Sequence, residues 1–182
     1  MMHEVILSDD QTAYAEKVGY ARYLQARERG AHHYFGDIDP EENDRWSCCC
    51  EFALLLLLRA WGLIVKWNSL LDGRRVKLSK IAEIECNGIQ IDAKGVEKNY
   101  KGLLVKDGGA RPFHAYVLVL AEHRPRYLIP YRSMMWGHEM AKVPLAQNMA
   151  KPGHLVPQGD PRLRDMEWEI AWRTGIAGKL AG

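Results

Sequence analysis

The chain has 182 residues, of which 47% are hydrophobic and 26% are charged, as is typical of one globular domain with a substantial core. Its formal net charge of +2 excludes any argument for nucleic-acid binding from the charge of the whole chain. The charges are nevertheless unevenly placed, since residues 1–45 hold five Lys or Arg against ten Asp or Glu, and residues 94–132 hold eight against three. The basic middle of the chain is suited to face an anion, although an ordinary solvated surface can show the same imbalance.

The longest apolar runs, residues 52–58 and 115–121, are too short to span a bilayer, so we expect no membrane partner. The first four residues lack the basic start and apolar core of a signal peptide, which predicts a cytoplasmic protein. Its four cysteines are then expected to be reduced thiols. Since Cys48, Cys49 and Cys50 are adjacent and no Cys-x-x-Cys motif occurs, the sequence indicates core packing for them rather than a zinc site.

Two helices are predicted in the first third of the chain. Ser8-Asp9-Asp10-Gln11 has the pattern of a capping box, and the helix that it opens is expected to run to about Arg29. The apolar stripe of this helix is expected to contain Tyr14, Val18, Ala21 and Leu24. After a loop over residues 31–45, a second helix is predicted from Cys48 to Trp61, with Ser47 as its cap. This second helix is apolar nearly all round and is expected to be buried.

Glu51 is the only acid of the second predicted helix. A charge on a buried helix is costly unless it has a partner or a function. Alternatively, Glu51 lies near the first turn, where the helix dipole favours a carboxylate. The sequence leaves both interpretations open.

The remainder of the chain is dominated by predicted strands, at residues 63–67, 101–106, 114–121, 126–131 and 154–156. Within them, residues 117–120 are expected to form a central strand covered on both faces, whereas Pro130 makes its strand an edge candidate. A short helix is possible around Met134 to Met140, and a last helix is expected to begin at Met166.

This order of elements predicts an α/β (α+β) fold in which a mixed central β-sheet is flanked by helices. We treat residues 1–182 as a single domain. Its parts are an N-terminal helix with an acidic loop (1–45), a core (46–132) and a C-terminal extension (133–182).

Asn87-Gly88 lies between two runs of alternating polarity, which is the strongest short-range signal for a β-hairpin. A two-residue turn there pairs Cys86 with Ile89 and places the alternate side chains on opposite faces. The apolar face holds Ile84, Cys86, Ile89, Ile91 and Ala93, and the polar face holds Glu83, Glu85, Gln90, Asp92 and Lys94. Acids converging on one face are able to hold a divalent cation, but the solvated face of an ordinary hairpin has the same composition.

Glu51 on a helix, Glu85 on the first hairpin strand and Asp92-Ala93-Lys94 on the second follow an order that resembles the PD-(D/E)XK nuclease superfamily, whose fold is restriction-endonuclease-like. The chain also resembles small uncharacterised phage- and prophage-encoded proteins, through the stretches 103–105, 116–120 and 155–158. The chain departs from the superfamily pattern because the first acid is Glu85 rather than Asp and the usual preceding proline is absent. In the superfamily pattern, Asp92 and Lys94 are the second acid and the lysine. The phage-type pattern allows another register, with Gln90 in the acid position. We favour the superfamily register, because in it Asp92 supplies a second carboxylate.

The resemblance implies a metal-dependent nuclease that hydrolyses phosphodiester bonds in DNA. Glu85 and Asp92 would hold Mg²⁺ or Mn²⁺, and Lys94, Glu51 and Gln90 would complete the catalytic site. The phosphate backbone would be neutralised by Lys98, Lys101, Lys106, Arg111, Arg124 and Arg126.

Two further interpretations stay open. In the first, the chain is a catalytically silent nuclease-like fold that binds nucleic acid or a protein. In the second, it is a structural phage component. A homodimer is also possible, since nucleases of this kind pair to cut two strands. A phage-encoded chain would act in the cytoplasm of its host.

Overall fold

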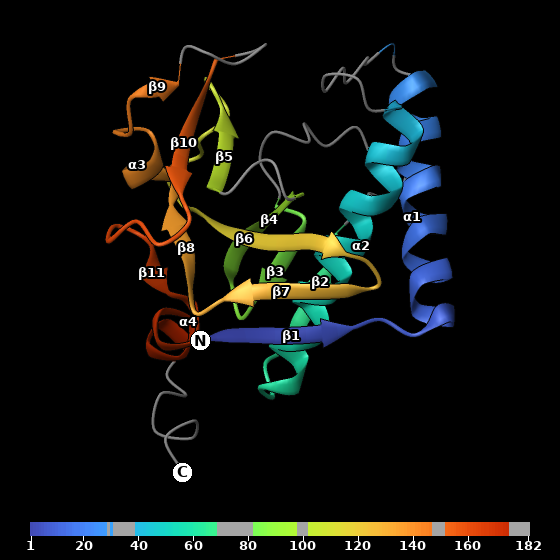
Figure 1. Ribbon diagram of the computed structural model, residues 1–182, viewed down its shortest axis with the longest axis horizontal. Helices are drawn as coiled ribbons and strands as arrows, with labels where there is room; N and C mark the ends of the chain where they lie inside the picture. The colour runs from blue at the N-terminus through green and yellow to red at the C-terminus, as the bar shows by residue number, and fades with distance from the viewer. Residues whose placement is uncertain (29, 31–38, 69–81, 98–101, 147–151, 175–182) are drawn as a thin grey trace.

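The computed structural model of the protein describes residues 1–28, 30, 39–68, 82–97, 102–146 and 152–174 (Figure 1). Its main sheet has eight strands within these ranges, in the order β1–β7–β6–β4–β3–β2, with β8 paired to β6 and β11 paired to β8. These strands are β1 (Met2–Ile6), β2 (Val65–Trp67), β3 (Ile84–Cys86), β4 (Ile89–Val96), β6 (His114–His123), β7 (Arg126–Pro130), β8 (Arg132–Trp136) and β11 (Arg164–Asp165).

A smaller antiparallel sheet in the order β5–β10–β9 lies beside the main one. Its strands are β5 (Gly102–Lys106), β9 (Leu145–Ala146) and β10 (Gly153–Pro157). The helices are α1 (Asp9–Glu28), α2 (Pro40–Ala60), α3 (Gly137–Met140) and α4 (Met166–Thr174). Because β4 and β6 run parallel while their other neighbours are antiparallel, the main sheet is mixed, and the predicted α+β class is confirmed.

The capping box at the start of α1 is confirmed by two reciprocal hydrogen bonds. The backbone N–H of Ser8 donates to Gln11 Oε1 at 2.9 Å, and the N–H of Gln11 donates to Ser8 Oγ at 3.3 Å. The predicted apolar stripe is confirmed at Val18, which is buried together with Ala15 and Gly19, but it is wrong at Tyr14 and Leu24, which are exposed. Helices α1 and α2 approach each other at Gly19, where a Cβ atom would clash with the carbonyl oxygen of Asp44.

Helix α2 begins earlier than predicted. Asp39 caps it by accepting from the N–H groups of Glu41 and Glu42, and Pro40 occupies the first turn, where its fixed φ suits a helix. The predicted cap at Ser47 is therefore wrong, and so is the predicted loop over residues 40–45; residues 31–38 lie outside the described ranges. The three adjacent cysteines of α2 are buried free thiols in the core, as expected.

Two strands of the main sheet differ from the sequence prediction. The strand with Pro130 is not an edge, because β1 pairs with it and places Met2 opposite Pro130 at the strand end. Proline is tolerated at this terminal position of a strand. Strand β1 itself was not predicted from the sequence. Part of the short helix considered around Met134 to Met140 is instead β8, with only Gly137–Met140 helical.

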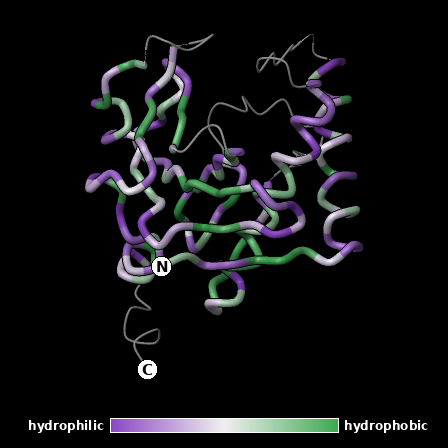
Figure 2. Tube along the Cα trace, in the orientation of Figure 1, coloured by the Kyte–Doolittle hydropathy of each residue, from purple (hydrophilic) through white to green (hydrophobic). Residues whose placement is uncertain are grey.

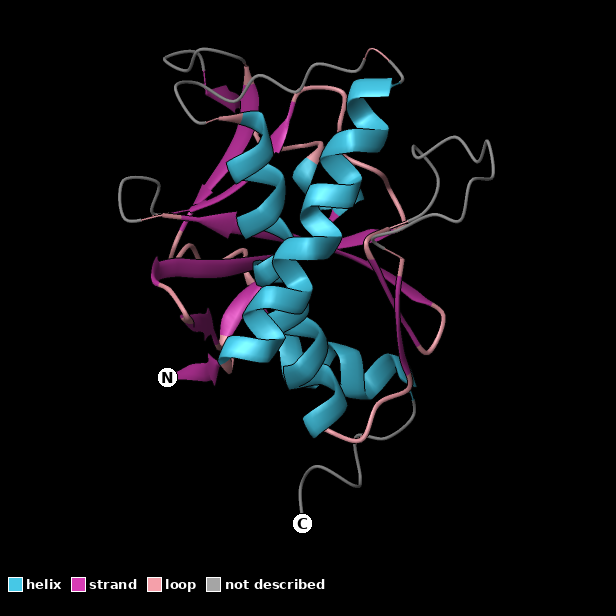
Figure 3. Ribbon diagram, turned by 90° about the vertical axis from the view of Figure 1, so that its right-hand side faces the viewer, coloured by secondary structure: helices cyan, strands magenta, loops and turns pink. Residues whose placement is uncertain are grey.

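The main sheet has a separate hydrophobic cluster on each face. Helix α2 packs against the face that carries Ile84, Ile91 and Val117 (Figure 3). On the other face, Tyr116 and Leu118 pack with the small sheet. Strand β6 is therefore covered on both sides, as predicted for residues 117–120, and Figure 2 shows its trace as largely hydrophobic. Within the described ranges, no helix is both long and apolar enough to cross a lipid bilayer.

Candidate functional site

The β3–β4 hairpin adopts the register that the sequence predicts. Cys86 pairs with Ile89, Glu85 with Gln90, and Ile84 with Ile91. Asn87 and Gly88 both have positive φ values, of 46° and 83°, which are those of a two-residue type I′ turn. Because this turn fixes which side chain faces which side, the polar residues of β4 lie on the face opposite α2.

Cross-strand pairing arranges the polar face in rows that run across the strands. One row follows Lys66, Glu85, Gln90 and His114 from β2 to β6. In the neighbouring row Asp92 lies beside Tyr116, which lies beside Met135. Glu83 joins this second row from just before β3, where the regular pairing of the two strands has ended.

Glu83 and Asp92 are joined by two bonds between side chain and backbone. The N–H of Ala93 donates to Glu83 Oε2 at 2.9 Å, and the N–H of Glu83 donates to Asp92 Oδ1 at 3.4 Å. These bonds replace the ladder bonds that β3 and β4 would otherwise make at this point. As a result, two carboxylates are held side by side at the end of the hairpin ladder.

Two basic side chains flank this carboxylate pair. Lys94 Nζ lies 3.6 Å from Glu83 Oε1 and 5.7 Å from the centre of the Tyr116 ring. His114 Nδ1 donates to Asp92 Oδ2 at 2.9 Å, across the parallel β4–β6 pair. We call Glu83, Asp92, Lys94 and His114 the carboxylate cluster.

The carboxylate cluster perturbs the charges of its members. Burial, together with the charges of Glu51 and Asp92, raises the pKa of Glu83 to about 8, and Lys94 only partly offsets this. Burial also opposes ionisation of Asp92, but the bond from His114 and the charge of Lys94 hold its pKa below the usual range. Burial acts to lower the pKa of Lys94, yet the two carboxylates raise it. The cluster therefore combines a permanent anion, a permanent cation and one acid that binds a proton near neutral pH.

Glu51 lies in the middle of α2 and is 1% exposed. The two terminal nitrogens of Arg22 each donate to one of its oxygens at 2.7 Å, and Trp67 Nε1 donates at 2.9 Å. The interpretation that Glu51 lies near a first turn is wrong, because α2 begins at Pro40. It has a partner instead, and its carboxylate belongs to a closed ion pair between the two helices.

The other predicted site residues are distributed unevenly around the carboxylate cluster. Gln90 accepts from the N–H of Ala82 at 3.1 Å, and Glu85 lies opposite it, one row away from Asp92. The prediction from the sequence took Glu85 as the first acid and gave Glu83 no part in binding the metal. The hairpin count already placed Glu83 opposite Asp92, so the signal for Glu83 was present. No local pattern in the sequence indicates that β6 runs parallel to β4, so the position of His114 beside Asp92 could not be predicted.

Most of the predicted phosphate-binding residues are not gathered at the carboxylate cluster. Arg124 Nη2 is 3.1 Å from Glu97, and Arg126 is bonded to Glu4, beyond the end of β6 opposite to His114. Lys106 ends β5, and Arg111 lies nearer, with its N–H donating to the hydroxyl of Tyr116 at 2.9 Å. Lys98 and Lys101 lie outside the described residues. Contact of any of these six residues with nucleic acid stays a prediction.

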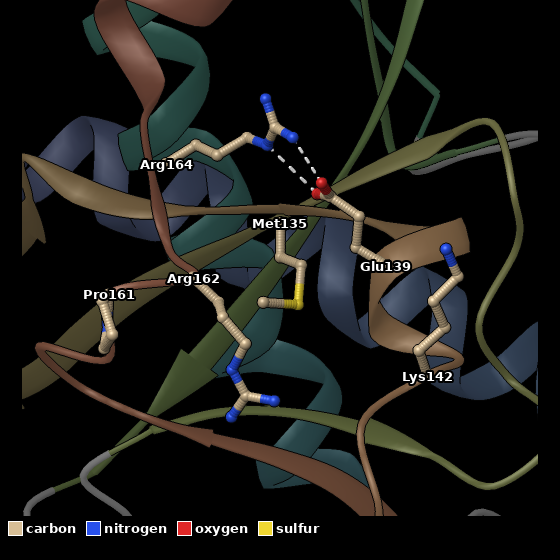
Figure 4. Close-up of a pocket in the computed structure, with 6 residues that line it drawn as sticks. All are labelled: Met135, Glu139, Lys142, Pro161, Arg162 and Arg164. Carbon is tan, nitrogen blue, oxygen red and sulfur yellow. Dashed lines mark hydrogen bonds and ion pairs between the residues drawn. The ribbon is translucent and has the colours of Figure 1, made fainter.

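A pocket of about 420 Å³ lies elsewhere, between β8, α3 and β11 (Figure 4). Arg164 and Glu139 point toward each other there and form an ion pair. Arg162 is similarly bound to Asp160 at 2.7 Å. Since its two arginines are matched with acids, this pocket is a weaker candidate for an anion site than its composition suggests.

The carboxylate cluster fits only some metal ions. Among the described residues, no three His, Cys, Asp or Glu side chains are arranged to hold a metal together. Mg²⁺, however, is commonly held by one or two carboxylates and keeps several of its waters. Two carboxylates such as Glu83 and Asp92 would be enough for Mg²⁺ or Mn²⁺ but not for a metal that needs a complete protein cage, and binding of either ion stays a prediction.

Known proteins offer no independent guide to the role of the cluster. Comparison with protein-family models, with curated proteins and with solved structures finds no match to this chain.

Proposed function

We propose that the protein is a metal-dependent nuclease that hydrolyses phosphodiester bonds in DNA, with the carboxylate cluster as its centre. The observation that carries this proposal is the adjacent pair Glu83 and Asp92, flanked by Lys94 at 3.6 Å, in surroundings that raise the pKa of Glu83 to about 8. A carboxylate that holds a proton near neutral pH because of burial and neighbouring acids gains from exchanging it for a cation. Perturbed groups of this kind are typical of functional sites.

Each group would contribute to the reaction in its own way. A divalent cation between Glu83 and Asp92 would supply charge at the phosphate and favour ionisation of a nearby water. Lys94 would stabilise negative charge that develops on the phosphate as one P–O ester bond breaks. His114 would hold Asp92 ionised and correctly oriented, as a hydrogen-bonded partner behind a ligand does.

The arrangement revises the site that the resemblance implies. Asp92 and Lys94 keep their roles as acid and lysine, while Glu83 takes the place of Glu85 as the first acid. Glu51 would act through its charge on Glu83 rather than as a ligand, because Arg22 and Trp67 already bind it. A restriction-endonuclease-like topology, a phage or prophage origin, a cytoplasmic location and a homodimer that cuts both strands belong to the same proposal.

A catalytically silent nuclease-like fold is the second candidate. The contact between Lys94 and Glu83 favours it, since this ion pair partly neutralises the cluster without any cation. In this alternative the fold binds nucleic acid or a protein without cleaving it.

Cleavage of labelled linear, circular and branched DNA in Mg²⁺ or Mn²⁺, with EDTA as a control, separates the two candidates. Lys94→Ala is expected to lose activity by roughly 100-fold or more. Lys142→Ala, an exposed lysine outside the cluster, is the matched control. Glu83→Gln is expected to be inactive, while Glu85→Gln retains most activity. If Glu85→Gln were inactive and Glu83→Gln active, Glu85 would be the ligand instead. If the folded wild-type protein cleaved no DNA, the silent fold would be the better interpretation.

A further inference from the structure

A second candidate site lies at the far end of the hairpin, away from the carboxylate cluster. An open groove of about 800 Å³ runs between the hairpin turn and α4. Its lining residues are Asn87, Gly88, Ile89, Arg164, Trp168, Glu169, Trp172 and Arg173. Nothing in the proposed hydrolysis uses these residues.

Two tryptophans of α4 are exposed in this groove. Trp168 and Trp172 are four residues apart and therefore lie on one side of the helix, while Met166 and Ile170 are buried on the other. The two indoles are 56% and 65% exposed and stack on each other, with centres 5.5 Å apart and planes 10° from parallel. Large aromatic side chains left in water at this extent are commonly sites of recognition.

The polar lining of the groove consists mainly of donors. Glu169 is the only acid among the described lining residues and is 6% exposed. It accepts from Trp136 Nε1 at 3.0 Å, from Arg173 at 3.3 Å and from Arg164 at 3.4 Å. The acid is thus covered. Arg164 is also bonded to both oxygens of Glu139, whereas Arg173, whose side chain is 49% exposed, contacts Glu169 through its Nε. A ligand in the groove meets flat apolar rings flanked by guanidinium groups.

We propose that this groove binds single-stranded nucleic acid, with unpaired bases stacked on Trp168 and Trp172 and a phosphate near Arg173. Aromatic platforms beside positive charge are the usual means of binding single strands without sequence preference. Apart from the two tryptophans, Ile89 is the one apolar side chain among the described lining residues, so the groove offers a protein partner little continuous apolar surface to bury.

The proposal rests on the proposed function for the choice of nucleic acid as ligand, and it narrows the substrate to strands with unpaired bases. The groove lies at the tip of the hairpin on the side of α2 and α4, whereas the carboxylate cluster lies on the opposite face of the sheet. Gly88 is four residues from Asp92 along β4, or roughly 14 Å of extended strand, so a single strand that reached both sites would also have to pass around the hairpin turn.

The test measures binding without cleavage. A fluorescein-labelled oligothymidylate of about 12 nucleotides is titrated with the protein in EDTA, and its anisotropy is followed. Trp168→Ala with Trp172→Ala is expected to raise the Kd at least about tenfold, and Trp168→Phe with Trp172→Phe to raise it less, since phenyl rings still stack. Ile6→Ala, which changes an exposed apolar residue on β1, is the matched control. Circular dichroism and thermal unfolding establish that each variant is folded.

Three outcomes would overturn the assignment. The first is an unchanged Kd in the double alanine variant, and the second is equal affinity for a duplex of the same length. The third is that sedimentation shows the wild-type protein to be a dimer, the double alanine variant to be a monomer, and the oligonucleotide to leave the wild-type dimer intact. Because EDTA removes divalent cations, a protein that never cleaves DNA is still able to pass this test. Failure of the nuclease proposal and failure of the groove proposal are therefore distinguishable.

Discussion

Glu51 and Glu83 each face a basic side chain, but the surroundings of the two carboxylates differ. Both oxygens of Glu51 are bonded to Arg22, and Trp67 adds a further donor. Glu83 meets Lys94 at the longer distance of 3.6 Å, its side chain is 27% exposed, and another carboxylate lies beside it. The same residue type therefore serves a closed structural pair in one place and an exchangeable site in the other. What separates them is whether all the hydrogen-bonding capacity is used by fixed partners.

The largest expected effect tests the closed pair. Glu51→Gln leaves the guanidinium of Arg22 without its buried counter-charge, so we expect the free energy of unfolding to fall by about 3–5 kcal/mol in denaturant titrations. The control is Glu41→Gln, which breaks the half-exposed pair with Arg45 on the same helix and is expected to cost less than about 1 kcal/mol. If the free energy of unfolding fell equally in the two variants, the pair of Glu51 with Arg22 would stabilise the fold no more than a surface ion pair does.

The exchangeable site is expected to respond to cations. Mg²⁺ or Mn²⁺ at 100 times its Kd should stabilise the protein by about 2.7 kcal/mol, because only the folded chain holds Glu83 and Asp92 together. Thermal unfolding with and without the metal measures this shift. The shift should persist in Glu85→Gln and vanish in Glu83→Gln. Its persistence in Glu83→Gln would place the cation elsewhere.

Stability is also expected to depend on pH through Glu83. Its pKa is about 8 in the folded protein against an ordinary value of 4.5, so the folded state binds the extra proton between these pH values. Stability should therefore fall as the pH rises from about 4.5 to 8, with a slope of at most about 1.4 kcal/mol per pH unit. Urea unfolding across this range should show the decline in the wild type and a flatter profile in Glu83→Gln. An identical profile in both would mean that Glu83 ionises normally.

The smallest effect concerns the pKa of Glu83 itself. Lys94 lowers this pKa, so Lys94→Met should raise it further above 8. NMR titration of the labelled side-chain carboxyl measures the change directly. Lys66→Met on β2, in the neighbouring row, is the control and should leave the pKa of Glu83 nearly unchanged. If Lys94→Met also left the pKa of Glu83 unchanged, the charge of Lys94 would have no effect on Glu83 across the 3.6 Å contact.

Local sequence patterns predicted those features that depend on neighbouring residues. Asn87-Gly88 determined the hairpin register, and Ser8 with Gln11 determined the start of α1. The buried side of α1 was missed because it depends on the close approach of α2 at Gly19. The edge position expected for Pro130 was wrong because β1, from the other end of the chain, pairs with it.

The candidate site was predicted only in part for the same reason. Asp92 and Lys94 follow from alternation along one strand. Glu83 lies outside the regular ladder and reaches Asp92 through bonds between side chain and backbone. His114 arrives through the parallel pairing of β4 with β6, a contact between residues 22 apart in the sequence. Whether these groups bind a cation stays a prediction.

The two-residue turn at Asn87-Gly88 also bears on how faithfully the chain folds. If the hairpin slipped by one residue, the faces of β4 would exchange, so that Asp92 and Lys94 would enter the core beneath α2 while Ile91 faced the side of Glu83 and Tyr116. Burying those charges unpaired would cost far more than the few ladder bonds that a slipped hairpin keeps. The polar face that forms the candidate site therefore also discriminates against misfolded pairings, so a change that neutralises it is expected to loosen the choice of register as well as the chemistry.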